Sequence, residues 1–234
     1  MTRLPPQTLP DPLPQDPLQT AAHWLQQAYD ESVAPNPNAM TLATVGPDGQ
    51  PSARIVLCKD IVLPEGYVLF FSNYQSRKGA ELAARPRAAT IFHWDVLHRQ
   101  VRIEGLIVPS PVAESDEYFE SRAWQSRIGA WASHQSQPVD SRSALLESVK
   151  AVARQYAGDS VRDDHQLLDD LAARPKIPRP PHWGGYRLWA DTVELWVEGE
   201  YRIHDRARWT RRLTAVGSPG HFHATPWHAT RLQP

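Results

Sequence analysis

The chain has 234 residues, of which 41% are apolar and 22% are charged, and its formal net charge is −1. This size and composition are sufficient for one sizeable domain with a buried core. A nearly neutral chain has no general attraction for nucleic acid or anionic lipid, so we expect neither as a partner. The sequence holds no apolar run of roughly 18 residues and no apolar secretion core near its start, so we expect a cytoplasmic protein with no membrane span.

The first part of the chain divides into an arm and a helix. Residues 1–15 are rich in Pro and polar side chains and show no helical period, which predicts a mobile N-terminal arm. Asp16 followed by Pro17 is typical of a helix start. The apolar positions expected on one face of this helix are Leu18, Ala22, Leu25 and Tyr29.

Alternating apolar and polar residues predict strands from Met40 onward. The turn sequences GPDGQ and PEG separate the first three of them, which indicates an antiparallel meander. Helices inserted between hairpin-ordered strands predict one closed or nearly closed antiparallel barrel flanked by helices. The predicted strands cover residues 40–45, 51–60, 67–73, 87–95, 99–108, 184–190, 192–199 and 201–213, and the predicted helices cover 76–86, 115–131 and 141–158.

The predicted helix 115–131 carries Tyr118, Arg122 and Ser126 at intervals of four. That spacing places a phenol, a guanidinium and a hydroxyl on one helical face. Three such donors suit an anion with several oxygens, of which phosphate is the commonest. The alternative interpretation is an ordinary solvated helix face.

Four basic residues belong to the first meander and the turn after it. Arg54 and Lys59 are an odd number of residues apart, so on a regular strand they face opposite sides unless a bulge intervenes. Arg77 and Lys78 follow Ser76 at a predicted helix start, where free backbone N–H groups favour phosphate. Exposed surface charge is the alternative for each of them.

A second cluster lies in YRIHDR, where strand alternation puts Arg202, His204 and Arg206 on one face. Two arginines beside a histidine favour an anionic or electron-rich ligand opposite them, and exposed edge-strand charge is the alternative. Gln135 and Ser136 add amide and hydroxyl groups that can bind a heterocycle edge.

Other candidate sites are excluded on residue type and spacing. Cys58 is the single cysteine and lies in an apolar strand, so we expect a small core residue rather than a nucleophile. The histidines His221, His223 and His228 lack a carboxylate or thiol that completes a metal site, so no metal is expected. The phosphate- and dinucleotide-binding motifs GxxxxGK[ST] and GxGxxG and the hydrolase motif GxSxG are absent from the sequence.

Seven separated blocks of the sequence form one recognisable pattern: RIVLCKD, FFSNYQSRKGAELAARPRA, HRQVRIEG, YFESRAWQSRIGAWASHQS, WGGYRL, ELWVEGEYRIHDR and RLQP. In their order and wording they resemble the pyridoxamine 5′-phosphate oxidases, a family of FMN-dependent split-barrel proteins. The resemblance covers residues 14–206 and the last few residues.

The resemblance implies a mainly β fold with flanking helices, namely an FMN-binding split β-barrel formed as a single domain over residues 16–234. It implies a cytoplasmic homodimer whose subunits share each active site. The implied reaction is oxidation of pyridoxamine 5′-phosphate or pyridoxine 5′-phosphate to pyridoxal 5′-phosphate. Hydride passes from the 4′ carbon to flavin N5, and O2 is reduced to H2O2 as the flavin is reoxidised. Residues 158–178 look like an insertion in this pattern.

The resemblance also implies roles for particular residues. The residues expected to bind FMN are Arg54, Ile55, Val56, Leu57, Lys59, Phe71, Ser72, Arg77, Lys78, Gln100, Gln135, Ser136, Trp196 and Arg206. The residues expected to hold the substrate phosphate are Lys59, Tyr118, Arg122 and Ser126. Arg202 and His204 are the expected catalytic residues, lying over the pyridine ring and stabilising its charge.

Two other functions remain open at the level of the sequence. One is a flavin oxidase of the same fold that acts on a phenazine-like reduced ring, and relatives of that kind lack the phosphate-binding pattern of Tyr118, Arg122 and Ser126. The other is a non-catalytic barrel that binds flavin or haem, for which Arg202 and His204 would have no use.

Overall fold

The computed structural model describes residues 8–157, 176–217 and 220–234. Within them, no helix has both the length and the apolar content required to cross a bilayer. Much of the predicted insertion 158–178 and residues 1–7 of the predicted arm lie outside the described residues. The described chain forms two compact units. We call them the barrel unit (residues up to Phe70, Glu81–Pro109 and Tyr186–Pro234) and the helical unit (Phe71–Ala80 and Ser110–Gly185).

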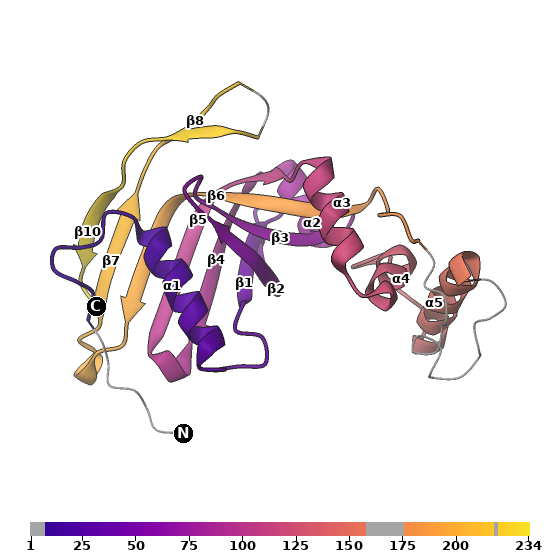
Figure 1. The fold of residues 1–234 in the computed structure, drawn as a ribbon, viewed down its shortest axis with the longest axis horizontal. Helices are drawn as coiled ribbons and strands as arrows, with labels where there is room; N and C mark the ends of the chain where they lie inside the picture. The colour runs from indigo at the N-terminus through magenta and orange to yellow at the C-terminus, as the bar shows by residue number, and fades with distance from the viewer. Residues whose placement is uncertain (1–7, 158–175, 218–219) are drawn as a thin grey trace. The chain divides into compact units, whose positions relative to one another are not determined.

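The barrel unit is built on one sheet that closes on itself (Figure 1). Its strand order is β10-β7-β6-β3-β2-β1-β4-β5, and an additional pairing of β5 with β6 closes a six-stranded barrel. β7 and β10 extend the sheet beyond β6. The strands are β1 (Ala39–Val45), β2 (Pro51–Val62), β3 (Tyr67–Asn73), β4 (Arg87–Trp94), β5 (Arg99–Pro109), β6 (Trp183–Val197), β7 (Asp205–Thr210) and β10 (His228–Leu232).

Inward-facing apolar side chains on alternate strand positions fill the barrel. In β1 this alternation buries every second residue, among them Met40 and Leu42. The antiparallel barrel expected from the sequence is therefore confirmed. The fully buried side chains of this core include Met40, Leu42, Phe70, Phe92, Ile103, Leu188, Leu195 and Trp209.

β6 is one strand, whereas the sequence predicts two strands separated at Asp191. The register against β5 shifts at this point, because Glu104 pairs with Thr192 and Gly105 pairs with Ala190. Asp191 is therefore the extra residue of a bulge, which lets the strand continue. Gly105 is required opposite the bulge, since a Cβ there would lie 1.8 Å from the carbonyl oxygen of Trp189.

The first helix, α1 (Pro17–Asp30), begins as predicted. The Asp16 carboxylate accepts a hydrogen bond from the Leu18 N–H at 2.9 Å. Its buried face differs from the expected one, because Tyr29 is exposed while Trp24 and Ala28 are buried. Before this helix, residues 9–14 of the predicted arm contact β7: the Leu9 N–H donates to Asp205, and the Trp209 indole donates to the Pro14 carbonyl.

The C-terminal strands were not predicted from the sequence. β10 pairs with β7, and a separate hairpin is formed by β8 (Leu213–Ala215) and β9 (Phe222–Ala224). These strands are short and carry His, Thr and Ala, so their apolar alternation is weak.

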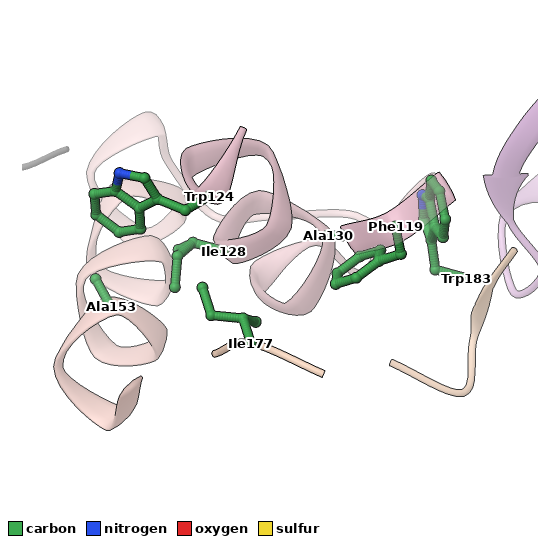
Figure 2. Close-up of a cluster of buried hydrophobic side chains, with 7 residues drawn as sticks. All are labelled: Phe119, Trp124, Ile128, Ala130, Ala153, Ile177 and Trp183. Atoms are coloured by element: carbon green, nitrogen blue, oxygen red, sulfur yellow. The ribbon is translucent and has the colours of Figure 1, made fainter. Parts of the chain in front are cut away.

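The helical unit holds α3 (Val112–Ser121), α4 (Trp124–Ala132) and α5 (Arg142–Ala157), as well as the start of α2 (Arg77–Ala84). Its core cluster is drawn in Figure 2, where Trp124 and Ile128 of α4 lie close to Ala153 of α5 and to Ile177. Phe119 and Trp183 form the other end of this cluster, with their rings 5.1 Å apart in an edge-on arrangement.

Candidate functional site

The helical unit contains a pocket of about 300 Å³. Its walls come from the end of β3, from α4 and the turn that follows it, and from the start of β6. Polar side chains make up much of its lining. The lining residues are Asn73, Arg122, Ser126, Gly129, Ala130, Ser133, Gln135 and Trp183.

The predicted helix 115–131 is broken where it meets this pocket. Arg122 ends α3 with an extended ψ of 148°, and Ala123, with a ψ of 137°, precedes α4. The expectation that Tyr118, Arg122 and Ser126 share one continuous helical face is therefore wrong. Arg122 and Ser126 nevertheless line the pocket together, because the break turns the Arg122 side chain beside the first turns of α4.

The Arg122 guanidinium is half-buried and incompletely paired. It lies 4.5 Å over the Trp183 ring and 5.5 Å over the Phe119 ring. Its Nη1 is buried and has no hydrogen-bond partner within the described part of the chain. Burial lowers the pKa of this guanidinium, with a further decrease from the charge of Arg127 and an opposing increase from Tyr118. A buried cation with an unused N–H is costly unless an anion completes it.

Gln135 presents a donor to the same pocket. Its Oε1 accepts a hydrogen bond from Lys78 Nζ at 2.6 Å, so the amide NH2 is the group left to face a ligand. Lys78 itself is only 9% exposed and also donates to Ser76 Oγ at 3.2 Å. Arg77 and Lys78 thus both lie at the start of α2, where Lys78 is buried and Arg77 is exposed.

The start of α2 is held by side chains that precede it. Ser76 is fully buried, donates to the Asn73 carbonyl and accepts from the Gly79 N–H. Gly79 is obligatory, since a Cβ would lie 2.0 Å from the Tyr74 carbonyl oxygen. Asn73 is also fixed on its other side, where its Nδ2 donates to the Ser133 carbonyl at 3.3 Å. These contacts join the end of β3 to the turn that follows α4.

Four further predicted residues of the helical unit lie around these contacts. Tyr118 stacks on Phe71 with ring centroids 4.0 Å apart, and Phe71 stacks on Trp183 at 5.4 Å. Ser72 is buried next to Phe71 on β3. Ser136 is exposed and has a left-handed φ of 72° in the turn after Gln135. Tyr118 is thus part of an aromatic stack rather than of the pocket lining.

In the barrel unit, β2 carries the predicted run from Arg54 to Lys59. Val56 is half-buried on the inward face, whereas Ile55 and Leu57 face outward with 64% and 36% of their surface exposed. The register against β3 shifts between Cys58 and Asp60, so Lys59 is the extra residue of a bulge. The predicted exception for Arg54 and Lys59 is therefore present: a bulge interrupts the regular alternation, so their odd spacing does not require them to face opposite sides.

Arg54 is engaged inside the barrel unit. Its guanidinium donates to Thr44 Oγ1 at 2.5 Å, to Ser52 Oγ at 2.6 Å and to the buried Glu81 carboxylate at 3.1 Å. Thr44 also donates to Glu81. These hydrogen bonds engage the Arg54 side chain, which was expected to bind FMN. In this conformation the side chain holds β2 in place.

Arg206 is paired in a similar way. Its Nη2 and Nε donate to Glu194 Oε1 at 2.8 and 3.2 Å, and Arg102 donates to the other oxygen at 2.6 Å. Glu194 is only 2% exposed. In the sheet register, Trp196 of β6 pairs with Gln100 of β5 on one side and with Arg206 of β7 on the other.

Arg202 and His204 lie on a tight loop rather than on a strand. Glu200–Arg202 forms a 3₁₀ turn, and β7 begins only at Asp205. Tyr201 and Arg202 have left-handed φ values of 56° and 67°, which cost about 1–3 kcal/mol each for residues other than glycine. The expected single face of Arg202, His204 and Arg206 is therefore wrong, because strand alternation does not extend through this loop.

The orientation of the His204 ring is fixed by its neighbours. The Gly199 N–H donates to His204 Nδ1 at 3.2 Å, and the ring lies 4.7 Å from that of Trp196. Because Nδ1 accepts this bond, the neutral ring carries its proton on Nε2. His204 therefore offers a hydrogen-bond donor at Nε2.

Four residues important to these arrangements were not singled out from the sequence. Asn73 and Trp183 line the pocket, while Glu81 and Glu194 neutralise Arg54 and Arg206. A glutamate at an apolar-flanked position, as in TVELWV, is the signal that could have identified Glu194.

The fold, the pocket of the helical unit and the predicted site residues of the barrel unit together define a class of protein. It is a split barrel of the FMN-binding type whose helical unit carries a pocket that is lined by hydrogen-bond donors and suited to an oxyanion. Residues 25–156 match the family described as pyridoxamine 5′-phosphate oxidase, and residues 183–234 match the pyridoxine 5′-phosphate oxidase C-terminal dimerisation region. The chain belongs to the pyridoxamine 5′-phosphate oxidase family.

Relatives extend over nearly the whole chain. A pyridoxine/pyridoxamine 5′-phosphate oxidase from Burkholderia orbicola is 48% identical over 94% of this chain and 89% of its own length. The corresponding protein of Paraburkholderia phytofirmans is 47% identical over 90% of this chain and 85% of its own length. These matches support an oxidase.

Solved structures show the same fold. PhzG from Burkholderia lata, in complex with tetrahydrophenazine-1-carboxylic acid, is 29% identical with a TM-score of 0.76, covering 96% of this chain and 95% of PhzG. An FMN-binding protein related to pyridoxamine 5′-phosphate oxidase, from Nostoc punctiforme, is 15% identical with a TM-score of 0.64 and covers 94% and 98%. The mainly β split barrel expected from the sequence is confirmed.

Proposed function

We propose that this protein oxidises pyridoxamine 5′-phosphate or pyridoxine 5′-phosphate to pyridoxal 5′-phosphate with bound FMN, and that O2 is reduced to H2O2. The observation that carries this proposal is the buried Nη1 of Arg122, which has no hydrogen-bond partner among the described residues and lies in a pocket that Ser126 and Gln135 also line. Each of these three side chains can donate a hydrogen bond, and a phosphate ester offers several acceptor oxygens on a single group.

The pocket favours a phosphate over a neutral polar group for an electrostatic reason. An anion stabilises the Arg122 charge, whose hydration burial removes, and an ionised partner makes stronger hydrogen bonds than a neutral one. Anchoring one end of a small substrate in this way limits the motion of its ring. Such positioning can account for several kcal/mol of the barrier reduction in an enzyme.

The residues present also fit a flavin mononucleotide. Lys78 at the start of α2 and the backbone N–H groups of that helix suit the phosphate of a cofactor. On the barrel unit, the outward backbone and side chains of β2, together with Gln100, Trp196 and Arg206, remain the predicted flavin contacts. When bound, FMN supplies a two-electron acceptor that takes hydride from the 4′ carbon of the substrate and passes the electrons to O2.

Within this proposal, the residues of the loop that follows β6 act on the pyridine ring. His204 donates a hydrogen bond from Nε2, because Gly199 occupies Nδ1. The Arg202 guanidinium stabilises negative charge on the ring or its substituents. Both residues orient and polarise the substrate, and neither needs to remove a proton. Tyr118 and Lys59 remain predicted contacts of the substrate phosphate.

We further propose that the protein is a homodimer whose subunits share each active site. The match of residues 183–234 to a dimerisation region supports a homodimer. The barrel unit also exposes large apolar side chains that a partner subunit would cover: Ile55 (64% exposed), Leu57 (36%), Tyr201 (91%) and Ile203 (72%).

A second candidate is oxidation of a reduced phenazine-like ring, which the similarity to PhzG favours. The two functions differ in their use of the Arg122 pocket, because tetrahydrophenazine-1-carboxylic acid has no phosphate.

The test compares substrates in one assay. Protein reconstituted with FMN is given pyridoxamine 5′-phosphate, pyridoxine 5′-phosphate or tetrahydrophenazine-1-carboxylic acid in air, and H2O2 release is measured. We expect rapid turnover of one or both phosphorylated compounds. Turnover of the phenazine compound alone would replace the proposal with the second candidate, and flavin binding without any turnover would indicate a non-catalytic flavin protein.

A further inference from the structure

The loop 199–204 between β6 and β7 is strained and must be held by its surroundings. Tyr201 and Arg202 both have positive φ. Gly199 has no room for a side chain, since a Cβ would lie 1.8 Å from the Ile203 carbonyl oxygen. Tyr201 and Ile203 are exposed, so their side chains contribute little packing within this chain. A backbone of this kind persists only where neighbouring contacts determine it.

At its C-terminal end the loop is fixed by Asp205, the first residue of β7. One Asp205 oxygen accepts from the Leu9 N–H at 2.8 Å, and the other accepts from Arg231 Nη1 at 2.6 Å. The ladder of β7 with β6 and β10 then continues beyond Asp205. The end of the loop nearest His204 therefore has its own anchor.

At its N-terminal end the loop is fixed by Glu198 and His98. The carboxylate of Glu198 contacts His98 Nδ1, and the Glu198 N–H donates to the His98 carbonyl at 2.9 Å. His98 is therefore joined to Glu198 by both its backbone and its side chain. Glu198 is followed directly by Gly199, whose N–H holds His204 Nδ1.

His98 has features that packing does not explain. It is only 6% exposed, it has a left-handed φ of 57°, and its Nε2 is buried with no partner in the residues that the structure describes. Each of these is unfavourable for a histidine, whereas an apolar residue or a glycine would avoid one or more of them. The contact with Glu198 is the interaction for which a ring nitrogen is needed at this position.

We propose that His98, acting through Glu198, is a positioning residue that holds the loop so that His204 and Arg202 are presented correctly. The proposal rests on the function proposed above only in assuming that His204 and Arg202 act on the substrate. Its structural part concerns three consecutive links: His98 to Glu198, Glu198 to Gly199 along the chain, and the Gly199 N–H to His204 Nδ1. If Glu198 moves, the donor that selects the His204 tautomer moves with it.

The first experiment observes His204 directly and needs no turnover. Nitrogen-15 NMR of the histidine side chains is recorded on the full chain as purified, and the His204 signals are assigned by their loss in His204→Gln. In the parent protein we expect an unprotonated Nδ1 and a protonated Nε2. In His98→Phe and in Glu198→Ala we expect averaged signals of the two tautomers. His204 signals that remain as in the parent in both variants would overturn the proposal.

The second experiment separates positioning from general structure. With pyridoxamine 5′-phosphate, both variants should lose about 10- to 100-fold in kcat, the effect expected of misplaced catalytic groups, while KM changes by less than about twofold. The matched control is His93→Phe, an exposed histidine on the adjacent strand β4, which should leave kcat and the His204 signals unchanged.

The two experiments also distinguish a failure of this inference from a failure of the proposed function. A parent protein with no oxidase activity but with variant-dependent His204 signals would contradict the proposed function and support the positioning role. An active parent whose kcat and His204 signals are insensitive to both variants would do the reverse. Should His98→Phe fail to fold, Glu198→Ala decides alone, because the Glu198 side chain is 38% exposed and its removal leaves no buried cavity.

Discussion

Replacing Arg122 with alanine should weaken substrate binding while leaving the ligand-free protein nearly as stable as the parent. The guanidinium has an Nη1 with no hydrogen-bond partner in residues 8–157, 176–217 and 220–234, and it lies in the donor-lined pocket. One charge-assisted hydrogen bond to phosphate is worth about 1.5–3 kcal/mol. At about 1.4 kcal/mol for each factor of ten, this corresponds to a KM raised about 10- to 150-fold.

The expected change in stability is small because opposing contributions nearly cancel. Alanine removes the contacts of the guanidinium with the rings of Trp183 and Phe119, worth about 0.5–2 kcal/mol together. It also removes a buried N–H without a partner, whose burial costs about 1–3 kcal/mol. We therefore expect the free energy of unfolding to decrease by no more than about 1 kcal/mol and to increase by no more than about 2.5 kcal/mol.

The assay for Arg122→Ala is steady-state oxidation of pyridoxamine 5′-phosphate, followed by urea unfolding of the same preparation. Arg142→Ala is the matched control, since Arg142 is exposed at the start of α5 in the same unit. A KM equal to that of the parent would refute the phosphate assignment. A large loss of stability with unchanged KM would show instead that Arg122 has a structural role.

Two further predictions concern buried ionisable groups of the barrel unit. Glu194→Gln should lower the free energy of unfolding by about 3 kcal/mol, because Arg102 and Arg206 are both paired with this buried carboxylate. The control Glu104→Gln changes a side chain that is 38% exposed, so it should alter the free energy of unfolding in urea titrations by less than about 0.5 kcal/mol. Equal effects of the two substitutions would exclude this role for Glu194. Burial raises the pKa of the Cys58 thiol to about 12, so the thiol stays neutral in the folded protein while it ionises above about pH 9 in the unfolded chain. The contribution of this neutral thiol to the free energy of unfolding is therefore fully present below pH 9 and decreases by about 1.4 kcal/mol per pH unit between pH 9 and pH 12. Cys58→Ala should lack this component, and parallel pH profiles of unfolding for parent and variant would contradict it.

The sequence predicted the barrel well because its strands alternate clearly and are bounded by recognisable turns. It did not predict the break in the helix before the pocket, since neither Arg122 nor Ala123 is a helix-breaking residue that would signal the extended conformation found there. The positive φ values of Tyr201 and Arg202 were hidden for a similar reason. Neither residue type signals a left-handed conformation, so continuous strand was the better interpretation from pattern alone.

The candidate site was predictable in its residue types more than in its geometry. Arg122, Ser126 and Gln135 meet in one pocket, as a phosphate site requires, although not through a shared helical face. The internal partners of Arg54 and Arg206 could not be foreseen, because Glu81 and Glu194 are distant from them in the sequence and ion pairs between distant residues leave no local pattern. Strong strand patterns therefore located these arginines without revealing what they contact.

The most direct test of the central claim, that this is an oxidase that recognises its substrate by the phosphate, is the ratio of kcat/KM for pyridoxamine 5′-phosphate to that for pyridoxamine. Three charge-assisted contacts of at least 1.5 kcal/mol each correspond to a ratio of about 10³ or more. We predict a ratio of that size, reduced at least tenfold in Arg122→Ala. A ratio near one in the parent protein would contradict the account.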